Sequence, residues 1–325
     1  MFAWALSYLM DSYVEMYQLT TDSTYLRKTA KYIRFILKNT DENKQKKDYK
    51  GRIRCGWGAS KYTGDSLWVV YPVHTGMILY PMLKFACIVK NARGPVQAMY
   101  SSLADSVVSL AVRCMAELDG QWVWINSRRE GYYRWEGDEP IKTNLQDPPP
   151  LNHHAALGKT LWRLWEVAGQ SAVRQKAEGI TRHFLNNVEK RKDKYVWGYR
   201  AELNKSHKIE DISHGAIEIE LVVEAVRAGM IPQKELKGFA ATLLHLKKNG
   251  YFANYVDGSE KYNNEEERTT TSMSAGRWLD LAQADCRVFE SVLDVYTRIL
   301  KNRDLKHPAE MLGVAKLLKW ERHCR

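Results

Sequence analysis

Histidines stand at several points where polar loops lead into apolar, helix-forming runs, and such positions suit anion binding and proton transfer. Asn152, His153 and His154 follow the prolines at 148–150, and proline commonly occupies the first turn of a helix. The dipole and free N–H groups of a helix start favour an anion, so an amide and an imidazole placed there could bind a carboxylate. The alternative is a helix capped by Asn152 beside two incidental histidines.

A second polar cluster runs from Glu210 to Gly215, directly before a clear amphipathic run. His214 falls in the expected first turn of that helix, which Asp211 or Ser213 could cap. Glu210 or Asp211 could orient the imidazole of His214 and tune its basicity. A capped helix start with a purely structural histidine is the alternative.

Two weaker positions complete the set. His74 lies at a third expected helix start, and Arg268 follows Tyr262 in a polar loop. An arginine in such a loop could clamp a substrate carboxylate in a bidentate pair. Three helix starts that carry histidine and face the same side are hard to explain by packing, so we expect one shared site.

Helical periodicity covers most of the chain and predicts the elements that position these residues. Apolar residues recur at helical spacing in paired segments with short turns between them. The expected pairs are 3–19 with 25–37, 74–89 with 96–118, 152–167 with 172–188, 211–228 with 233–248, and 272–284 with 287–300, and a last short helix begins near His307. Repeated helical pairs form either an open solenoid or a closed ring. We predict a single all-α domain over residues 1–325, an (α/α) toroid or incomplete barrel of about five to six hairpins.

Long connections separate the expected hairpins, at about residues 40–73, 119–151, 190–210 and 249–271. Long loops are usually functional, and in a toroid these loops would all emerge on one face. They are rich in Trp and Tyr, whose apolar faces and polar edges suit stacking on sugar rings. We therefore expect an aromatic-lined cleft; rings that fill the interior of the toroid are the alternative. The rings that we select from these loops are Trp57, Tyr133, Trp135, Trp197, Tyr199 and Tyr262.

The charge balance favours an anionic partner. The formal net charge is +11, with 49 Lys and Arg against 38 Asp and Glu, and such a field attracts polyanions. No zinc-finger or RNA-binding signature is present, so we expect an acidic polysaccharide and no nucleic acid. No segment reaches ~18 uninterrupted apolar residues, so no transmembrane helix is expected, and the N-terminus does not read as a signal peptide. Compartment and oligomeric state stay open.

The cysteines give no sign of a metal site or a disulfide framework. The five are widely scattered and form neither a CxxC pair nor a Cys/His metal spacing. Cys87 and Cys114 lie in apolar helical runs and are expected to be plain core residues. We predict no bound metal and no cofactor.

Several of these motifs also carry a family resemblance. Trp197-x-Tyr199 leading to Glu210-Asp211-x-Ser213-His214-Gly215 is similar to a pattern in alginate-lyase-like helical toroid enzymes. The opening 3–8 and the stretch 131–135 leading to Asn152-His153 look like the same group, in particular polysaccharide lyase family 38, which cuts glucuronan or alginate. Helical alginate lyases carry Asn-Asn-His where this chain has Asn152-His153-His154.

The resemblance implies a polyuronate lyase that acts by β-elimination. Such an enzyme neutralises the C6 carboxylate, removes the C5 proton and protonates the O4 leaving group. We assign neutralisation to Asn152 and His153 with Arg200 or Arg268. The resemblance implies His214 as the base or its partner, and Tyr199, Tyr262 or Tyr133 is the expected acid. The expected substrate-binding residues are His74, His154, Arg200, Glu210, Arg268, Trp57, Tyr133, Trp135 and Trp197.

Other functions fit parts of the same pattern. A uronate C5-epimerase uses the same first step and returns the proton to the opposite face. A glycoside hydrolase needs two carboxylates beside the scissile bond, for which Asp138, Glu139, Glu210 and Asp211 are available. A sugar 2-epimerase is another helical toroid, although its usual histidine contexts are missing here. A non-catalytic acidic-glycan-binding protein would need the charge and the aromatic rings but not the histidines.

Overall fold

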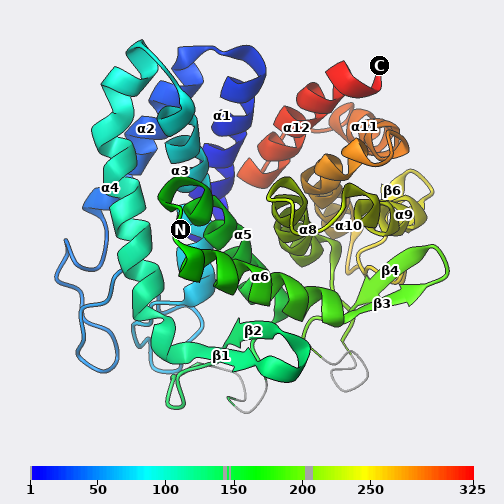
Figure 1. Cartoon of the computed structure of the whole chain (residues 1–325). Coiled ribbons are helices and arrows are strands. Elements are labelled where there is room, and N and C mark those ends of the chain that lie inside the picture. The colour runs from blue at the N-terminus through cyan, green and yellow to red at the C-terminus, as the bar shows by residue number, and fades with distance from the viewer. Residues whose placement is uncertain (1, 142–144, 146–147, 202–207) are drawn as a thin grey trace.

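The computed structural model describes residues 2–141, 145, 148–201 and 208–325. The described part is mostly helical, as Figure 1 shows, and the predicted all-α toroid is confirmed. Its helices follow one another as α1 (Ser7–Thr20), α2 (Ser23–Lys38), α3 (Pro72–Asn91), α4 (Pro95–Glu117), α5 (Leu151–Ala168), α6 (Ser171–Asn186), α8 (Ile212–Arg227), α9 (Leu236–Leu246), α10 (Glu265–Met273), α11 (Arg287–Leu300) and α12 (Pro308–Cys324). A π-helical turn, Phe2–Leu6, precedes α1, and a 3-10 helix, Ser274–Gln283, continues α10. The last helix, expected to be short, has 17 residues.

The helices form two concentric layers. α1, α3, α5, α8, the 3-10 helix Ser274–Gln283 and α12 contact one another in that order, and α12 packs against α1. These elements therefore close an inner ring, and α2, α4, α6, α9 and α11 pack on its outside. α3 is apolar and long enough to cross a membrane, but most of it is buried between its neighbours in the ring. Its hydrophobicity is thus explained by an inner position in the fold.

The starts of the inner helices are set by local sequence. Pro72 occupies the first turn of α3, and Pro150 directly precedes α5. The carboxylate of Asp211 accepts hydrogen bonds from the backbone N–H groups of Ser213 and His214, at 2.8 and 2.9 Å, and caps α8. These starts lie on the side of the ring where the long connections gather, along the lower edge of Figure 1.

Parts of the connections that we expected to be irregular fold as short antiparallel hairpins. β1 (Trp122–Ile125) pairs with β2 (Glu130–Tyr133), β3 (Val188–Arg191) with β4 (Lys194–Trp197), and β5 (Lys247–Lys248) with β6 (Tyr251–Phe252). α6 packs directly on the first hairpin at Gly179, where an added Cβ would lie 2.7 Å from the ring of Trp124. Only a glycine allows so close an approach, and it fixes the β1–β2 hairpin against the toroid.

Two disulfides correct the prediction from the cysteines. Cys55 in the first long connection pairs with Cys114 of α4, and Cys286 pairs with Cys324 at the end of α12. The expectations of no disulfide framework and of Cys114 as a plain core residue are therefore wrong. The partners are 59 and 38 residues apart and meet only in the folded chain, so spacing alone could not reveal them. Cys87 is free and buried.

The axis of the inner ring is filled by charged side chains. Lys84 of α3 contacts Asp11 and lies 2.6 Å from a carboxylate oxygen of Glu15, both from α1. Lys159 of α5 lies 2.5 Å from a carboxylate oxygen of Glu220 on α8. Because each of these buried charges faces an opposite one, the network is compatible with the low-dielectric interior. The rest of this axial ion-pair network consists of Asp280, Lys316 and Lys319.

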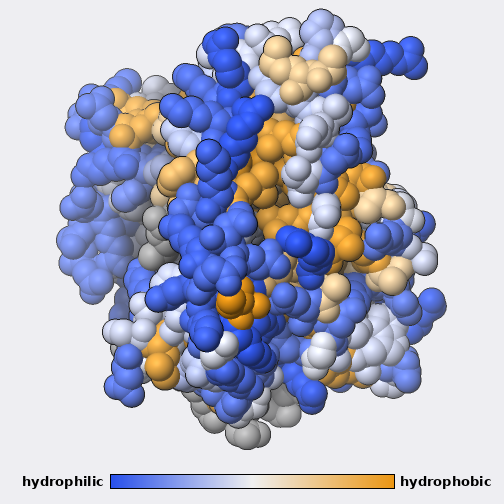
Figure 2. Space-filling view, turned by 90° about the vertical axis from the view of Figure 1, so that its left-hand side faces the viewer, coloured by the Kyte–Doolittle hydropathy of each residue, from blue (hydrophilic) through white to orange (hydrophobic). Residues whose placement is uncertain are grey.

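One side of the outer layer presents a mostly hydrophilic surface. Figure 2 shows the side of the molecule that lies at the left of Figure 1, where blue, hydrophilic residues surround a smaller apolar area. The exposed apolar side chains include Phe35 on α2 and Met99 on α4. Single exposed apolar residues are ordinary on a protein surface.

Candidate functional site

A cavity of about 460 Å³ opens where α3, α5 and α8 begin. The three helix starts that the sequence singled out therefore meet at one place. His74, His153 and His214 each come from a different inner helix and line this cavity. The other described lining residues are Trp4, Lys61, Tyr62, Tyr71, Val73, Trp135, Ile141, Pro150, Asn152, Tyr199 and Arg200. We call this space the site cavity.

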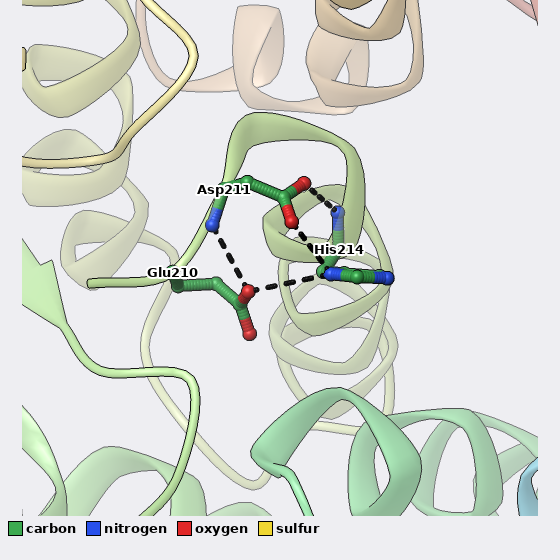
Figure 3. A group of neighbouring side chains, drawn as sticks. All are labelled: Glu210, Asp211 and His214. Carbon is green, nitrogen blue, oxygen red and sulfur yellow. Dashed lines mark hydrogen bonds and ion pairs between the residues drawn. The ribbon is translucent and has the colours of Figure 1, made fainter. Parts of the chain in front are cut away.

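His214 is held by two carboxylates, as Figure 3 shows. Its Nδ1 lies 2.6 Å from Oδ2 of Asp211 and 3.6 Å from Oε1 of Glu210, while Nε2 points away from both. Burial alone would lower the pKa of His214, but the two carboxylates outweigh it and raise the pKa to about 9. His214 is therefore an imidazolium at neutral pH.

His153 and His74 have the opposite electrostatics. Burial, together with the neighbouring charges of His214, His74 and Arg200, lowers the pKa of His153 to about 3. Burial and the charge of Lys61 lower the pKa of His74 to about 4. Both imidazoles are therefore neutral at physiological pH. An anion bound in the cavity would raise both pKa values, because it favours the protonated form.

Asn152 and Tyr199 border these histidines. The side-chain amide of Asn152 donates to Oε2 of Glu210 at 3.3 Å. The backbone N–H of Leu151 donates to the carbonyl of Tyr199 at 3.0 Å, which fixes the Tyr199 loop against the start of α5. The ring of Tyr199 lies 5.8 Å from that of His214, and burial raises the pKa of its hydroxyl to about 12. Tyr199 therefore keeps its proton and can donate it.

Aromatic rings form part of the cavity wall. The indole of Trp4 lies edge-on to His74, with ring centroids 5.7 Å apart, and Trp135 lies edge-on to His153 at 5.9 Å. Tyr62 is 39% exposed and reaches the same cavity. These rings could stack on a pyranose.

Some of the lining residues escaped the sequence analysis. Trp4, Lys61, Tyr62 and Tyr71 were not selected as site residues, although Trp4 lies in the opening segment that carries the family resemblance. Tyr71 directly precedes the start of α3, and its buried hydroxyl has no hydrogen-bond partner among the described residues. Burial and the carboxylate of Glu139 raise the pKa of this hydroxyl well above its usual value. A tyrosine next to a proline-initiated helix was the available signal.

Three aromatic residues that we selected lie away from the cavity. Trp197 is fully buried, stacks on Trp278 and donates its indole N–H to Glu218. Tyr133 is 2% exposed, and Trp57 is 4% exposed, with its indole N–H donated to the carbonyl of Ile36. Trp57 borders a separate shallow cavity. Trp197 and Tyr133 cannot contact a substrate in this conformation, because their rings are packed in the core.

The structure also separates Tyr262, Arg268 and His154 from the site cavity. The hydroxyl of Tyr262 donates to the carbonyl of Phe252 at 2.7 Å. The guanidinium of Arg268 lies 4.2 Å from the ring centroid of Tyr251. His154 is buried beside His183, on the other side of its helix start from His153. None of these three side chains lines the site cavity as the structure describes it.

Positive and neutral groups dominate the cavity wall. Lys61, Arg200 and the imidazolium of His214 line it, and none of the described lining residues is a carboxylate. Behind the wall, potential ligand atoms of Glu210, Asp211 and His214 lie within 4.8 Å of one another and are chemically able to hold a cation. Our expectation of a metal-free enzyme stays a prediction.

Comparison with known proteins identifies several solved structures with a similar fold. No protein-family model and no curated protein matches the chain. The cellobiose 2-epimerase from Bacillus thermoamylovorans is similar with a TM-score of 0.62 and 11% identity, over 98% of this chain and 87% of that chain. A sugar epimerase from a ruminal bacterium gives a TM-score of 0.61 and 13% identity, over 97% and 86%. The α-1,6-mannanase from Salegentibacter sp. HEL1_6 gives 0.59 and 12%, over 100% and 90%.

At such low identity these similarities show the fold alone. The three similar proteins are (α/α) toroid enzymes, and none of them is a member of polysaccharide lyase family 38, so the comparison gives no support for that family in particular. The expectation from the resemblance is therefore confirmed for the toroid architecture and not for the lyase family. The chain has the (α/α) toroid fold that sugar epimerases and a mannanase also use.

Proposed function

We propose that this protein is a carbohydrate-active enzyme that removes a proton from the carbon next to the carboxylate of a uronate residue. The observation that carries the proposal is the pairing of two neutral imidazoles with one imidazolium in a single cavity. His153 and His74 can accept a proton, and His214 can stabilise the negative charge that develops on the carboxylate.

The assignment of His214 differs from the role that the family resemblance implied. A group with a pKa of about 9 holds its proton at neutral pH, so it serves poorly as a base. His214, with Arg200 and Lys61, would instead neutralise the carboxylate of the sugar. Their combined charge lowers the barrier because it is already in place where the enolate-like transition state forms. His153 then becomes our first choice for the base, because the bound uronate anion raises its pKa from about 3 towards neutrality.

Epimerisation is our leading outcome of this first step. His74 and His153 come from different helices and line the same cavity. Because a bound uronate raises both pKa values, one imidazole can be protonated in the complex and give its proton to the opposite face after the other, neutral imidazole has removed the C5 proton. A toroid similar to those of two sugar epimerases is compatible with such a reaction. The second candidate is β-elimination, which needs an acid for the leaving oxygen. The protonated hydroxyl of Tyr199 in the cavity wall favours it.

Hydrolysis is less well supported by the geometry. It requires two carboxylates beside the scissile bond, and the described lining residues provide none. The carboxylate of Glu210 is buried and accepts hydrogen bonds from Asn152 and from the backbone of Asp211. A purely binding protein, in turn, would have no use for two neutral imidazoles, one buried (His74) and one partly buried (His153), because desolvating polar groups is costly.

The test is incubation with glucuronan, alginate and related polyuronates in D₂O. Deuterium at C5 with an inverted residue would establish epimerisation, and the ultraviolet absorbance of a conjugated C4–C5 double bond would establish elimination. New reducing ends without either signal would instead show a hydrolase. If C5 stays fully protonated and intact on every polyuronate, the proposal is wrong for these substrates.

A further inference from the structure

A second and larger cavity adjoins the site cavity. It has a volume of about 830 Å³ and lies between the β1–β2 hairpin, the end of α6 and the segment 134–137. Trp135 lines both cavities, and Pro149 of the larger one is followed directly by Pro150 of the smaller. A further small void is lined by Trp135, Pro149, His153 and His154, and so shares residues with both cavities. Trp135 therefore stands at the boundary of the two spaces.

The wall of the larger cavity contains a buried imidazole, that of His183, which has no short hydrogen bond to any described residue. His183 of α6 is 4% exposed, and neither of its ring nitrogens has a hydrogen-bond partner among the described residues. Its Nδ1 lies 3.6 Å from Oε1 of Glu130, whose other oxygen accepts a hydrogen bond from Asn186 at 2.7 Å. The ring stacks on Tyr132, with centroids 5.0 Å apart. Buried polar groups normally have partners, so an unsatisfied one that lines a cavity points to a ligand.

Of the two arginines that line the described part of the larger cavity, Arg128 lies 3.7 Å from a carboxylate oxygen of Glu130, which leaves Arg134. Of its carboxylates, Glu117 pairs with Arg54 at 3.1 Å, and Glu136 pairs with Arg52 at 2.9 Å. Lys50 lies 2.6 Å from Asp138. Arg134, by contrast, is exposed and forms no ion pair within the described ranges of the chain. Its guanidinium can therefore bind a carboxylate of a ligand.

We infer that the larger cavity is a subsite that binds a neighbouring uronate residue of the same glycan chain that occupies the site cavity. Trp135 would stack on the sugar at the junction, His183 would hydrogen-bond a hydroxyl, and Arg134 would pair with the carboxylate. This inference rests on the proposed function only for the anionic sugar class of the ligand. It implies that the protein acts on an oligomeric or polymeric substrate.

Calorimetric titration with a uronate monosaccharide and with uronate oligosaccharides of increasing length tests this subsite. For the unmodified chain, affinity should rise with length. Arg134→Ala should weaken binding of the long oligosaccharide by about tenfold or more, since a charged hydrogen bond is lost, and should leave the monosaccharide affinity unchanged. His183→Phe keeps a ring on Tyr132 but removes both nitrogens, and it should act in the same direction. Arg93→Ala, in the exposed turn after α3, is the matched control and should change nothing.

Three results would overturn the subsite. These are equal affinity for monosaccharide and oligosaccharide, long-oligosaccharide binding that survives both variants, and no binding of any uronate. Equally tight, Arg134-dependent binding of neutral oligosaccharides would overturn the uronate class. Failure of the proposed function is recognised separately, because length-dependent binding would then persist without deuterium exchange at C5.

Discussion

Two regions of the toroid use polar residues from the same inner helices in opposite ways. α5 carries His153 in its first turn and Lys159 further along, and α8 likewise carries His214 and then Glu220. On the axis, Lys159 and Glu220 form a close, buried ion pair. In the site cavity, the rings of His153 and His74 are desolvated and have no hydrogen bond from the described residues, although charged groups lie nearby. We infer that buried charges that are paired with an opposite charge stabilise the fold. Desolvated polar groups without a hydrogen-bond partner are instead available to bind a ligand.

The comparison predicts that site and axis variants fail in different ways. His153→Ala should reduce kcat by about 10²- to 10⁴-fold, the usual contribution of a general base or acid. The free energy of unfolding should hardly change, because the ring contributes no hydrogen bond to the described structure. Kinetics on the polyuronate that is turned over, together with urea denaturation, measure the two quantities. A large loss of stability with normal kcat would reverse the distinction between the regions.

Removing one charge from the axial ion-pair network should lower the stability of the fold and leave kcat unchanged. Glu220→Ala leaves Lys159 and Lys316 facing each other without their carboxylate, and removal of one partner of a buried ion pair typically costs about 3–5 kcal/mol. The activity per folded molecule should be retained at low temperature. Glu220→Ala combined with Lys159→Met should recover part of the lost stability. Denaturant midpoints of the single and double variants show whether the axis has this structural role.

The disulfide between Cys286 and Cys324 joins the 3-10/α11 region to α12, which supplies Lys316 and Lys319 to the axis. Replacing both cysteines with serine should lower the free energy of unfolding by about 2–4 kcal/mol, since the unfolded chain gains entropy. A matched variant is Cys87→Ser, which removes a buried free thiol and closes no loop. Thermal unfolding under oxidising and reducing conditions distinguishes them. If reducing agent destabilised the double serine variant as much as the parent chain, the Cys286–Cys324 disulfide would not be the source of the stabilisation.

The charge state of His214 predicts how the stability and the activity of the protein depend on pH. Its folded pKa of about 9 exceeds the ordinary value of about 6.5, so its interaction with Asp211 contributes stability below pH 6.5 that is lost as the pH rises through about 9. Activity should fall over the same alkaline range, because the imidazolium neutralises the substrate. Asp211→Asn should move this alkaline limb to lower pH by about one unit or more. A pH–rate profile and an NMR titration of the His214 ring test the shift; an unchanged alkaline limb in Asp211→Asn would assign it to another group.

The sequence allowed prediction of those features that depend on neighbours along the chain. Helical hairpins were predictable because apolar periodicity and proline or aspartate helix starts are local signals. For the same reason the meeting of His74, His153 and His214 could be anticipated once a toroid was assumed. The charged state of each histidine could not, since it depends on burial and on groups from other helices.

The errors come from contacts between distant segments. Trp197 and Tyr133 were read as exposed loop rings, but both lie at the ends of strands that pack into the core. The sequence analysis did not select Lys159 and Glu220, because only the closure of the ring brings these two residues together on the axis. The Cys55–Cys114 pair and the place of Lys61 in the cavity wall depend on the path of the first long connection, which periodicity does not describe. The Cys286–Cys324 pair depends on how α12 packs beside α11.

The most direct test of the central claim is C5 proton exchange on a uronate oligosaccharide in D₂O, followed by NMR. The unmodified chain and His245→Ala, which removes an exposed histidine of α9, should introduce deuterium at equal rates. His153→Ala should lose most of this exchange while its unfolding transition stays in place. If His153→Ala and His74→Ala both exchanged the C5 proton as fast as the unmodified chain, the account would be contradicted, because the neutral imidazoles would then not be the groups that move the proton.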